Sequence, residues 1–294
     1  MSKKILVFGG GGFLGSYLVE QLLQKRYIVT VADLKSSEYV DKSLFVECNI
    51  LDSDDVNKLV KDADIVYNLA GMANLDNAVE NPYKTIELNV MGNLNILDAC
   101  IKFDIKRFIY ASSAYAMSDK GSFYGISKLT SEKLIEEYKK KYGLNYTIIR
   151  YGSVYSERES ENNYIYNLIT EAILNGKIEH SGDGEEIREY IHASDVAKLS
   201  VDVIESTEFE NEHLILTGME RMKRKELFEI INEILGDSIE IILNGNGYNH
   251  HYKTTPYSFT PKKSKKLIPN PYIDIGQGIL ETIKIIYEKE VEDK

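Results

Sequence analysis

The sequence predicts an α/β fold in which a doubly wound parallel sheet is joined by a smaller, interleaved C-terminal α/β region. Over the first 150 residues, short β-branched apolar runs alternate with longer amphipathic stretches, a pattern typical of parallel strands joined by helices. A cluster of glycines directly follows the first apolar run. After Tyr151 the alternation loosens, so we divide the chain into residues 1–150 and 151–294, without a Pro/Gly/Ser-rich linker between them.

The expected elements follow from this alternation. In the first part each apolar run has the length of a buried strand, at residues 4–8, 28–32, 43–46, 65–68, 107–111 and 145–150. The amphipathic stretches are long enough to be helices, at residues 14–25, 53–60, 83–103 and 124–142. In the second part we expect helices at residues 163–175, 194–205, 223–235 and 278–289, and short strands at 214–216 and 239–243.

Charge and apolar content exclude several classes of protein. The chain of 294 residues has 46 Asp and Glu against 35 Lys and Arg, and its net charge of -11 would repel nucleic acid. No apolar run approaches the roughly 20 residues that span a bilayer, and glycines interrupt the apolar start, so we expect a cytoplasmic protein. Cys48 and Cys100 are expected to be free thiols. The histidines lack ligand spacing, so we expect no metal site.

The glycine cluster after the first strand predicts a dinucleotide site in a Rossmann-type sheet. Backbone amides at the start of the next helix can face a pyrophosphate where no Cβ intervenes. Gly10, Gly12 and Gly15 fit G-x-G-x-x-G, whereas Gly9, Gly12 and Gly15 fit G-x-x-G-x-x-G, and a plain tight turn is the alternative. Asp33, at the end of the second strand, would accept from ribose hydroxyls and repel a 2′-phosphate, which favours NAD over NADP. Otherwise Asp33 would only cap a helix.

Tyr124 and Lys128 are four residues apart, so in a helix they share one face. An ammonium group beside a phenol favours the phenolate, which can act as a base at neutral pH. The chain has 21 Tyr, so a chance pair on a solvated helix is the alternative explanation. The pair becomes informative through the motifs around it.

A series of motifs resembles the extended short-chain dehydrogenase/reductases, specifically the NAD-dependent nucleotide-sugar epimerase/dehydratase group. In chain order the motifs are residues 9–15, Asp33, residues 68–71, residues 89–92, residues 112–113, the Tyr124-x-x-x-Lys128 pair and residues 150–155. The likeness extends from residue 4 to about 200 and weakens toward the end. It implies that residues 1–150 bind NAD and carry the catalytic pair, and that residues 151–294 mainly bind a nucleotide-diphosphate sugar.

The resemblance also implies individual roles. Tyr124 would exchange a proton with a sugar oxygen, Lys128 would hold the nicotinamide ribose and lower the tyrosine pKa, and Ser113 would hydrogen-bond the same oxygen. The implied cofactor-binding residues are Gly9, Gly12, Phe13, Leu14, Gly15, Asp33, Asn49, Ile50, Leu69, Ala70, Gly71, Asn89, Tyr124, Lys128 and Tyr151. The implied substrate-binding residues are Ser113, Ala114, Ser153, Arg188, His250 and Lys253. As alternatives, Ser113 would only satisfy local backbone, Asn89 would cap a helix, and Arg188 would lie on the surface.

The residues after Ser113 bear on the reaction. Relatives that eliminate water have Asp and Glu where this chain has Ala114 and Tyr115, so the resemblance disfavours a 4,6-dehydratase. It favours oxidation at carbon 4 by a 4-epimerase or dehydrogenase, in making sugars for bacterial-type surface polysaccharide. A nucleotide 4-keto-sugar reductase remains an alternative, and a non-catalytic dinucleotide-binding regulator is the alternative from another class. By analogy, helices 83–103 and 124–142 would pair two copies in a homodimer.

Overall fold

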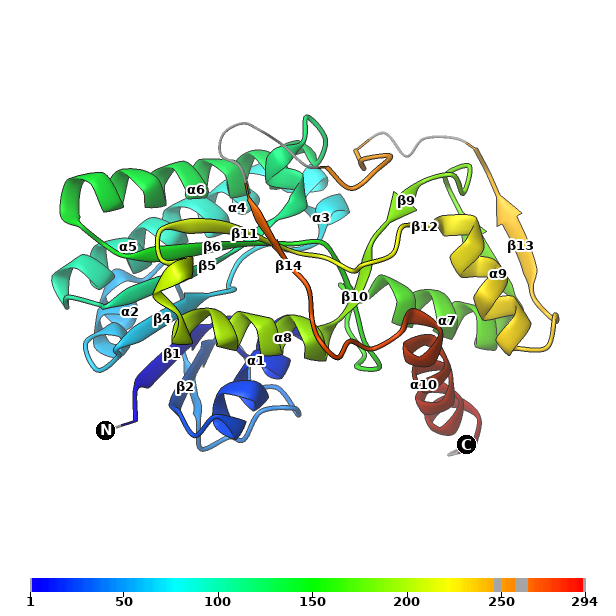
Figure 1. The fold of residues 1–294 in the computed structure, drawn as a ribbon, viewed down its shortest axis with the longest axis horizontal. Coiled ribbons are helices and arrows are strands. Elements are labelled where there is room, and N and C mark those ends of the chain that lie inside the picture. Colours follow the sequence, from blue (N-terminus) through cyan, green and yellow to red (C-terminus); the bar gives the residue numbers. More distant parts are fainter. Residues whose placement is uncertain (1, 246–249, 257–263, 293–294) are drawn as a thin grey trace.

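The computed structural model describes residues 2–245, 250–256 and 264–292. Its main sheet has eight strands, all parallel, in the order β14-β11-β6-β5-β4-β1-β2-β3. Figure 1 shows helices on both faces of this sheet, with α5 and α6 on one face and α1 and α8 on the other. The predicted doubly wound parallel sheet is therefore confirmed.

The bounds of the elements are as follows. The strands are β1 (Lys4–Phe8), β2 (Ile28–Asp33), β3 (Phe45–Glu47), β4 (Ile65–Asn68), β5 (Arg107–Ser113), β6 (Tyr146–Tyr151), β7 (Ser153–Tyr155), β8 (Lys177–His180), β9 (Ile187–Arg188), β10 (Tyr190–His192), β11 (Glu212–Leu216), β12 (Met222–Lys223), β13 (Glu240–Leu243) and β14 (Lys265–Leu267). The α-helices are α1 (Phe13–Gln24), α2 (Ser53–Val60), α3 (Leu75–Glu80), α4 (Pro82–Ile86), α5 (Gly92–Lys102), α6 (Ser122–Tyr142), α7 (Tyr164–Asn175), α8 (Ala193–Asp202), α9 (Arg224–Ile234) and α10 (Ile275–Tyr287). Shorter helical turns are η1 (Glu87–Met91), η2 (Ala114–Met117), η3 (Val203–Glu205), η4 (Thr207–Phe209) and η5 (Glu288–Glu292).

The sheet is buried because successive side chains of each strand point to opposite faces. On β1, Ile5 and Val7 pack in a core with α1 and α8. The alternate residues Leu6 and Phe8 pack in a second core with α2, α5 and α6. A parallel strand buried on both sides needs this continuous apolar run, which is why the sequence signal was clear.

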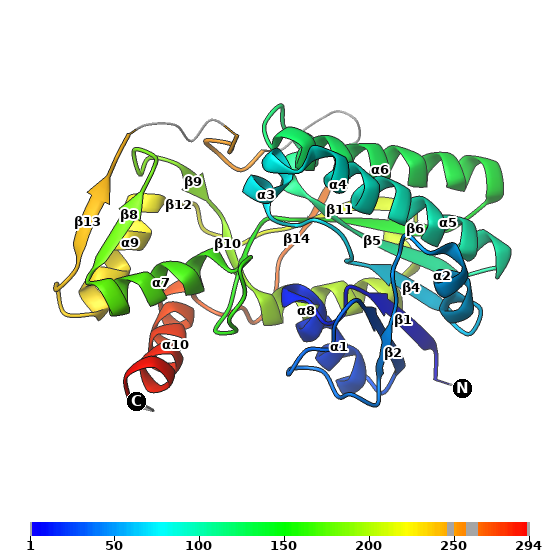
Figure 2. The ribbon, with the colours of Figure 1, turned by 180° about the vertical axis from the view of Figure 1, so that it is seen from behind.

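The second region is built from short strand pairs and helices. Here β7 pairs with β10, β8 with β13 and β9 with β12. Helices α7, α9 and α10 pack around Ile169, Phe228 and Ile279 in a separate core. They lie together at the end of the molecule away from the amino terminus (Figure 2). Strands β11 and β14 come from the same part of the chain but extend the main sheet instead.

Several expected elements need correction. The single helix expected over residues 83–103 is a continuous stretch of α4, the π-helical turn η1 and α5. Helix α3 and strands β7, β8, β9, β10, β12 and β14 were not predicted. These strands have two to four residues, too short for alternating hydrophobicity to show. A π-helical turn inserts one extra residue locally, which periodicity does not reveal, and such turns are frequent at functional sites.

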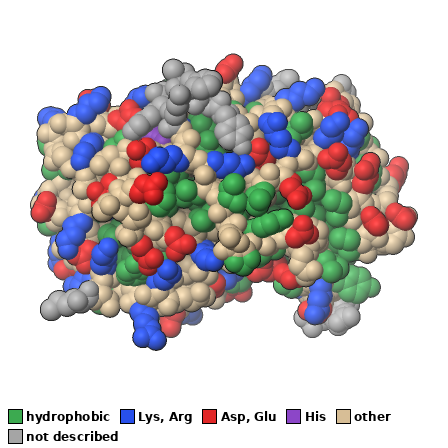
Figure 3. Space-filling view, in the orientation of Figure 1, with side chains coloured by type: hydrophobic (Ala, Val, Ile, Leu, Met, Phe, Trp, Pro, Cys, Tyr) green, Lys and Arg blue, Asp and Glu red, His purple; other side chains and the backbone are tan. Residues whose placement is uncertain are grey.

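The surface carries charges of both signs. On the face drawn in Figure 3, acidic and basic side chains lie interspersed, so the net charge of -11 is not gathered into one patch there. Within the described residues, no helix is both long and apolar enough to cross a bilayer.

Candidate active site

Two cavities meet at the carboxyl ends of the sheet strands. The first, of about 390 Å³, lies over β1, β2, β4 and β5, where a doubly wound sheet binds ligands. The second, of about 590 Å³, lies between the sheet and the C-terminal region. Ser113 and Tyr124 border both cavities. A molecule in one cavity can therefore meet a molecule in the other at these two side chains.

The first cavity begins at the glycine turn between β1 and α1. Gly9 has a φ of +75°, and a Cβ there would lie 2.6 Å from the Ala70 nitrogen. A Cβ on Gly15 would lie 2.1 Å from the Gly9 oxygen. Gly9, Gly12 and Gly15 line the cavity, which favours the G-x-x-G-x-x-G spacing. The turn leads directly into α1, whose N-cap Gly12 has no side chain to cap the first amides, an arrangement that suits a pyrophosphate.

Asp33 lies at the end of β2 beside this turn. Its carboxylate accepts hydrogen bonds from the amides of Gly11, at 3.0 Å, and Leu34, at 2.8 Å. Burial raises its pKa, and these two hydrogen bonds oppose the shift. Asp33 caps no helix, since α1 begins after Gly12 and α2 after Asp52. The carboxylate borders the cavity, where it can accept from a ribose hydroxyl.

Most of the residues expected to bind the cofactor line this one cavity. They are Gly9, Gly12, Phe13, Leu14, Gly15, Asp33, Asn49, Ile50, Leu69, Ala70, Gly71, Tyr124, Lys128 and Tyr151. The set comes from the ends of six strands, β1 to β6, and the segments that follow them, so the fold brings it together. A cavity of this outline, with a glycine turn at one end and a carboxylate on the second strand, fits NAD.

Asn89, also in the expected cofactor-binding set, does not border the cavity itself. It lies in η1, where its amide accepts from the Met72 nitrogen at 2.7 Å and donates to the Met72 oxygen at 3.0 Å. It also donates to the Ser127 hydroxyl at 2.9 Å. A Cβ on Gly71 would lie only 2.3 Å from the Asn89 side-chain oxygen. Asn89 thus supports the loop after β4 and the base of α6 from behind.

Ser113, Tyr124 and Lys128 come together at the ends of β5 and α6. The Lys128 ammonium donates to the Ala111 oxygen at 2.9 Å and lies 5.7 Å from the Tyr124 ring centroid. The Ser113 side chain lowers the pKa of Tyr124 in part. A ligand oxygen at the junction of the cavities would therefore meet both Tyr124, which can carry a proton, and Ser113, which can form a second hydrogen bond.

The pKa values differ from expectation. Burial raises the pKa of Tyr124 to about 12, so the expected lowering by Lys128 does not prevail. Burial likewise lowers the pKa of Lys128 to about 8, while the Glu132 carboxylate opposes that shift. Both directions have one cause, because a dry site disfavours the charged form of either group. The protonation of Lys128 is therefore sensitive to charges close to it.

The second cavity contains Ser113, Ser153, Arg188 and His250 from the expected substrate-binding set. Two other members of that set do not reach it. Ala114 is buried in an apolar cluster with Met117, Ile215 and Tyr252. Lys253 is exposed and lies 3.7 Å from the Asp183 carboxylate. His250, three residues before Lys253, does reach the cavity. The backbone oxygen of His250 accepts a hydrogen bond from the Gly121 nitrogen at 2.8 Å, which holds it there.

Further residues of this cavity escaped sequence reasoning. The Tyr115 hydroxyl hydrogen-bonds His251 Nδ1 at 2.7 Å, and its ring packs 4.6 Å from the Tyr252 ring centroid. Arg224, at the start of α9, lies buried with its guanidinium 3.7 Å from the Tyr164 ring centroid. The sequence signal for Arg224 was faint, since it stands among charged residues that read as a solvated helix face.

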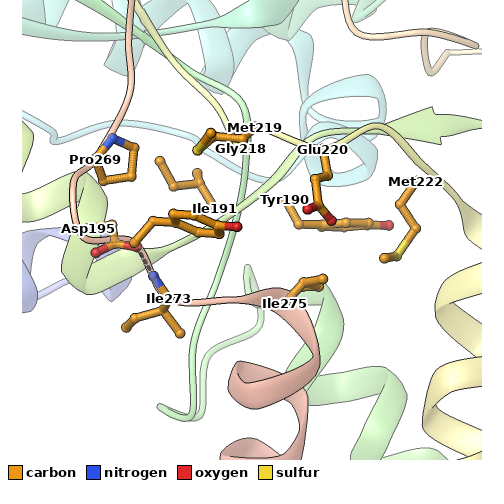
Figure 4. A pocket seen from close by; sticks show the side chains of 11 residues that line it. Tyr190, Ile191, Asp195, Gly218, Met219, Glu220, Met222, Pro269, Ile273 and Ile275 are labelled. Atoms are coloured by element: carbon orange, nitrogen blue, oxygen red, sulfur yellow. Dashed lines mark hydrogen bonds between the residues drawn. The ribbon is translucent and has the colours of Figure 1, made fainter.

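A third cavity, of about 30 Å³, lies between β10 and the segment before α10 (Figure 4). It has room for about two water molecules, far less than a sugar requires. The Asp195 carboxylate on its wall accepts from the Ile273 nitrogen at 2.8 Å, which fastens the C-terminal segment to α8. The Tyr190 side chain borders both this cavity and the second one.

Comparison with known proteins agrees with this geometry. The model of the "NAD dependent epimerase/dehydratase family" matches residues 5–216. The chain is 31% identical to the "Putative UDP-glucose 4-epimerase" of Methanocaldococcus jannaschii, over 95% of this chain and 97% of that protein. It superposes with a TM-score of 0.84 on UDP-glucose 4-epimerase from Thermotoga maritima, solved with UDP-glucose. That match has 26% identity and covers 97% of this chain and 99% of the other.

Relatives with another reaction also match along most of the chain. The dTDP-glucose 4,6-dehydratase of Streptomyces antibioticus is 24% identical, over 95% of this chain and 91% of its own length. Similarity along the whole chain therefore establishes the family but does not distinguish an epimerase from a dehydratase. One cavity contains the features that fit such a family. The glycine turn and Asp33 suit NAD, and the cluster of Ser113, Tyr124 and Lys128 suits a proton transfer. The chain belongs to the NAD-dependent epimerase/dehydratase family of nucleotide-sugar enzymes, and its cofactor is NAD.

Proposed function

We propose that the protein is an NAD-dependent 4-epimerase of a UDP-hexose. The observation that supports this proposal is that Ser113 and Tyr124 border both cavities, so Tyr124 could act as a proton carrier between cofactor and sugar. Inverting a hydroxyl-bearing carbon requires removing and returning one proton on oxygen and one hydride on carbon. When bound, NAD supplies the hydride acceptor and donor. The epimerases among the relatives support the choice of a UDP-sugar.

The protein side of the reaction is a proton transfer at one oxygen. Tyr124 takes the proton from the sugar hydroxyl and later returns it, with the Ser113 hydroxyl donating a hydrogen bond to the same oxygen. Protonated Lys128, close behind the ring, favours the phenolate form of Tyr124 against its burial. Ser113 and Lys128 are buried and Tyr124 is partly buried, which limits the access of water to the keto intermediate. Inversion then requires the keto sugar to present its other face.

The sugar nucleotide would be held through its diphosphate by two arginines. Arg188 and Arg224 are both buried and both border the second cavity. Each guanidinium lies over an aromatic ring, Arg188 at 4.3 Å from the Tyr252 centroid and Arg224 at 3.7 Å from the Tyr164 centroid. The rings fix the orientation of the guanidinium groups, and a planar fork suits phosphate oxygens. Two fixed cations match the two charges of a diphosphate.

The residues after Ser113 argue against dehydration within this proposal. Ala114 is 1% exposed and packed in an apolar cluster, so that position offers no acid to the cavity. The Tyr115 hydroxyl is engaged with His251, and burial lowers the pKa of His251 to about 4, so the imidazole is neutral at pH 7. Elimination across carbons 4 to 6 needs a second acid and base at carbons 5 and 6.

Product analysis tests the reaction. The protein is incubated separately with UDP-glucose, UDP-galactose and dTDP-glucose, and the sugars are followed by proton NMR. We expect interconversion of the two UDP-hexoses without net NADH. A 4-keto-6-deoxy product from any of them would establish a dehydratase and overturn the proposal. Net NADH with a released keto sugar would point to the dehydrogenase, and turnover only with a keto sugar and exchangeable NADH would point to the reductase.

The proposal includes a homodimer. Apolar side chains on α4, η1 and α6 are exposed, namely Tyr83 at 93%, Met91 at 51% and Ile126 at 57%. Covering such side chains with a second copy is the ordinary reason for their exposure. Light scattering after size exclusion should give twice the chain mass, and Ile126→Lys should give monomers. A wild-type monomer at micromolar concentration would remove the dimer from the proposal.

A further inference from the structure

Helix α6 meets the end of β5 in a regular way. Tyr124, Lys128 and Glu132 are spaced four residues apart, so they lie along one face of the helix. Together they meet three consecutive residues at the end of β5. Lys128 donates to the Ala111 oxygen at 2.9 Å, and Glu132 accepts from the Ser112 hydroxyl at 2.5 Å. Tyr124 lies beside Ser113, whose side chain lowers the tyrosine pKa in part.

Glu132 is the member of this series that the proposed proton transfer does not use. Its side chain is fully buried, and so is that of its partner Arg150 on β6. Arg150 donates to both carboxylate oxygens, at 2.8 and 2.6 Å, and a further guanidinium nitrogen donates to the Ser264 hydroxyl at 2.6 Å. Such a buried pair contributes little net stability compared with an apolar pair of the same shape. The role of the Glu132–Arg150 pair is therefore better explained by the groups that it holds in position.

Taking the proposed function as its basis, we propose that Glu132, oriented by Arg150, is a positioning residue for the reaction. It fixes Ser113 through Ser112, and its carboxylate keeps the positive charge of Lys128 beside Tyr124. The bidentate contact with Arg150 sets the carboxylate in one orientation, and the hydrogen bond from Ser112 then sets the strand end. Neither glutamate nor arginine touches the cavities, so their action is through Ser113 and Lys128.

The negative charge of Glu132 affects the pKa of Lys128 in one direction. Tyr124 and Glu132 on α6 and Tyr110 on β5 face Lys128, and Arg150 on β6 lies behind Glu132. Of these, Glu132 is the group whose charge raises the pKa of Lys128 against burial. Removing that charge moves the pKa further down. Lys128 then loses its proton at a lower pH, and the alkaline limb of the activity profile moves with it.

The test compares Glu132→Gln with Glu136→Gln. Glu136 lies one turn further along α6 and pairs with His213 at 3.1 Å, away from the end of β5, so it is a matched control. We expect Glu132→Gln to lower kcat at least tenfold, with KM within about threefold and NAD content unchanged. Its alkaline limb should move down by about one pH unit. The control should keep both kcat and the profile. An unshifted limb in Glu132→Gln would overturn the inference.

Folding and the proposed function are kept separate in this test. If Glu132→Gln does not fold, the double variant Glu132→Gln/Arg150→Met removes both buried charges and should show the same pH shift. If the wild type turns over no nucleotide sugar, the proposed function fails, and thermal unfolding decides the inference. Because the pKa of Lys128 is lower in the folded protein than in the unfolded chain, keeping Lys128 protonated destabilises the fold, and this destabilisation decreases as the pH rises. The Tm deficit of Glu132→Gln should therefore shrink from pH 7.5 to 9.5, and a constant deficit would contradict the inference.

Discussion

The first cavity, hereafter the cofactor cavity, and the second, hereafter the substrate cavity because we propose that the sugar nucleotide binds there, are built in different ways. The cofactor cavity is formed by loops that directly follow strands, and its shape at Gly9 and Gly15 is set by backbone atoms. The substrate cavity is formed by side chains from distant segments, such as Tyr115, Arg188, Arg224 and His251. The segment carrying His251 is tied to both halves, through the Gly121 amide to the His250 oxygen and the Ile187 amide to the Lys253 oxygen.

This difference shows which kind of change each cavity tolerates. A backbone-built site is damaged by adding a single methyl group, whatever its polarity. A site built by side chains is changed by replacing those side chains, and it can diverge while the fold persists. The family agrees with this reading, since 4-epimerases and 4,6-dehydratases match the same chain along nearly its whole length.

The largest effect is expected from Gly15→Ala. The added Cβ would lie 2.1 Å from the Gly9 oxygen, so the turn must shift and NAD should be lost along with essentially all activity. The measurement is the NAD content of the purified variant and its thermal unfolding. Gly143→Ala is the control, because that glycine also has a positive φ, +81°, but has open space around it. It should cost stability of about 1 kcal/mol and keep NAD. Full NAD content in Gly15→Ala would refute the backbone-built site.

At the junction, Tyr124→Phe should lower kcat by roughly a thousandfold, because the proton carrier is removed while the ring remains. NAD content should equal that of the wild type, since the glycine turn is untouched. Single-turnover assays with UDP-glucose measure the loss. Phe123→Tyr, which adds a hydroxyl next in sequence on a partly exposed side chain, is the control and should stay active. Retained turnover in Tyr124→Phe would remove the proposed mechanism.

On the substrate side, Arg224→Gln should lower kcat/KM by roughly 10-fold to 100-fold, mainly through KM. The reason is that one of the two proposed diphosphate contacts is lost. Lys225→Gln is the control, because Lys225 is exposed and pairs with Glu185 outside the cavity. Calorimetric titration with UDP should show the same loss of affinity without chemistry. Equal UDP affinity in both variants would place the diphosphate elsewhere.

The smallest effect is expected from Asp33→Asn, with NAD affinity falling roughly tenfold. The burial that raises the Asp33 pKa means that its carboxylate takes up a proton at a higher pH than an exposed aspartate does. Protonation removes a charged acceptor, so wild-type NAD affinity should decline from pH 7 to pH 5, whereas the affinity of the variant should change less. Calorimetry of NAD-depleted protein measures both. Parallel pH curves would exclude a ribose contact by Asp33.

The sequence predicted the parallel strands from β1 to β6, the glycine turn and Asp33 for one physical reason, whereas the other cofactor residues were implied by the resemblance to the family. A strand buried on both faces is a continuous apolar run, and the loop after it must carry the functional residues, so both signals are local. Asn89, which the resemblance implied as a support of the active-site backbone, lies in η1 and bonds the Met72 backbone and the Ser127 hydroxyl instead of bordering the cavity. The sequence did not show that Ala114 is buried in an apolar cluster or that Lys253 lies near Asp183, because sequence spacing does not report burial or ion pairing.

The sequence by itself determined the fold class, the glycine turn, Asp33 and the pairing of Tyr124 with Lys128, because each depends on residues close together in the chain. Only the tertiary structure decided that Arg224 and His251 border the substrate cavity, since their segments are joined to it by packing and backbone hydrogen bonds over long distances. It also decided the protonation of the site. Burial acts on Tyr124 and Lys128 in opposite directions, and Glu132 beside Lys128 partly restores the charge.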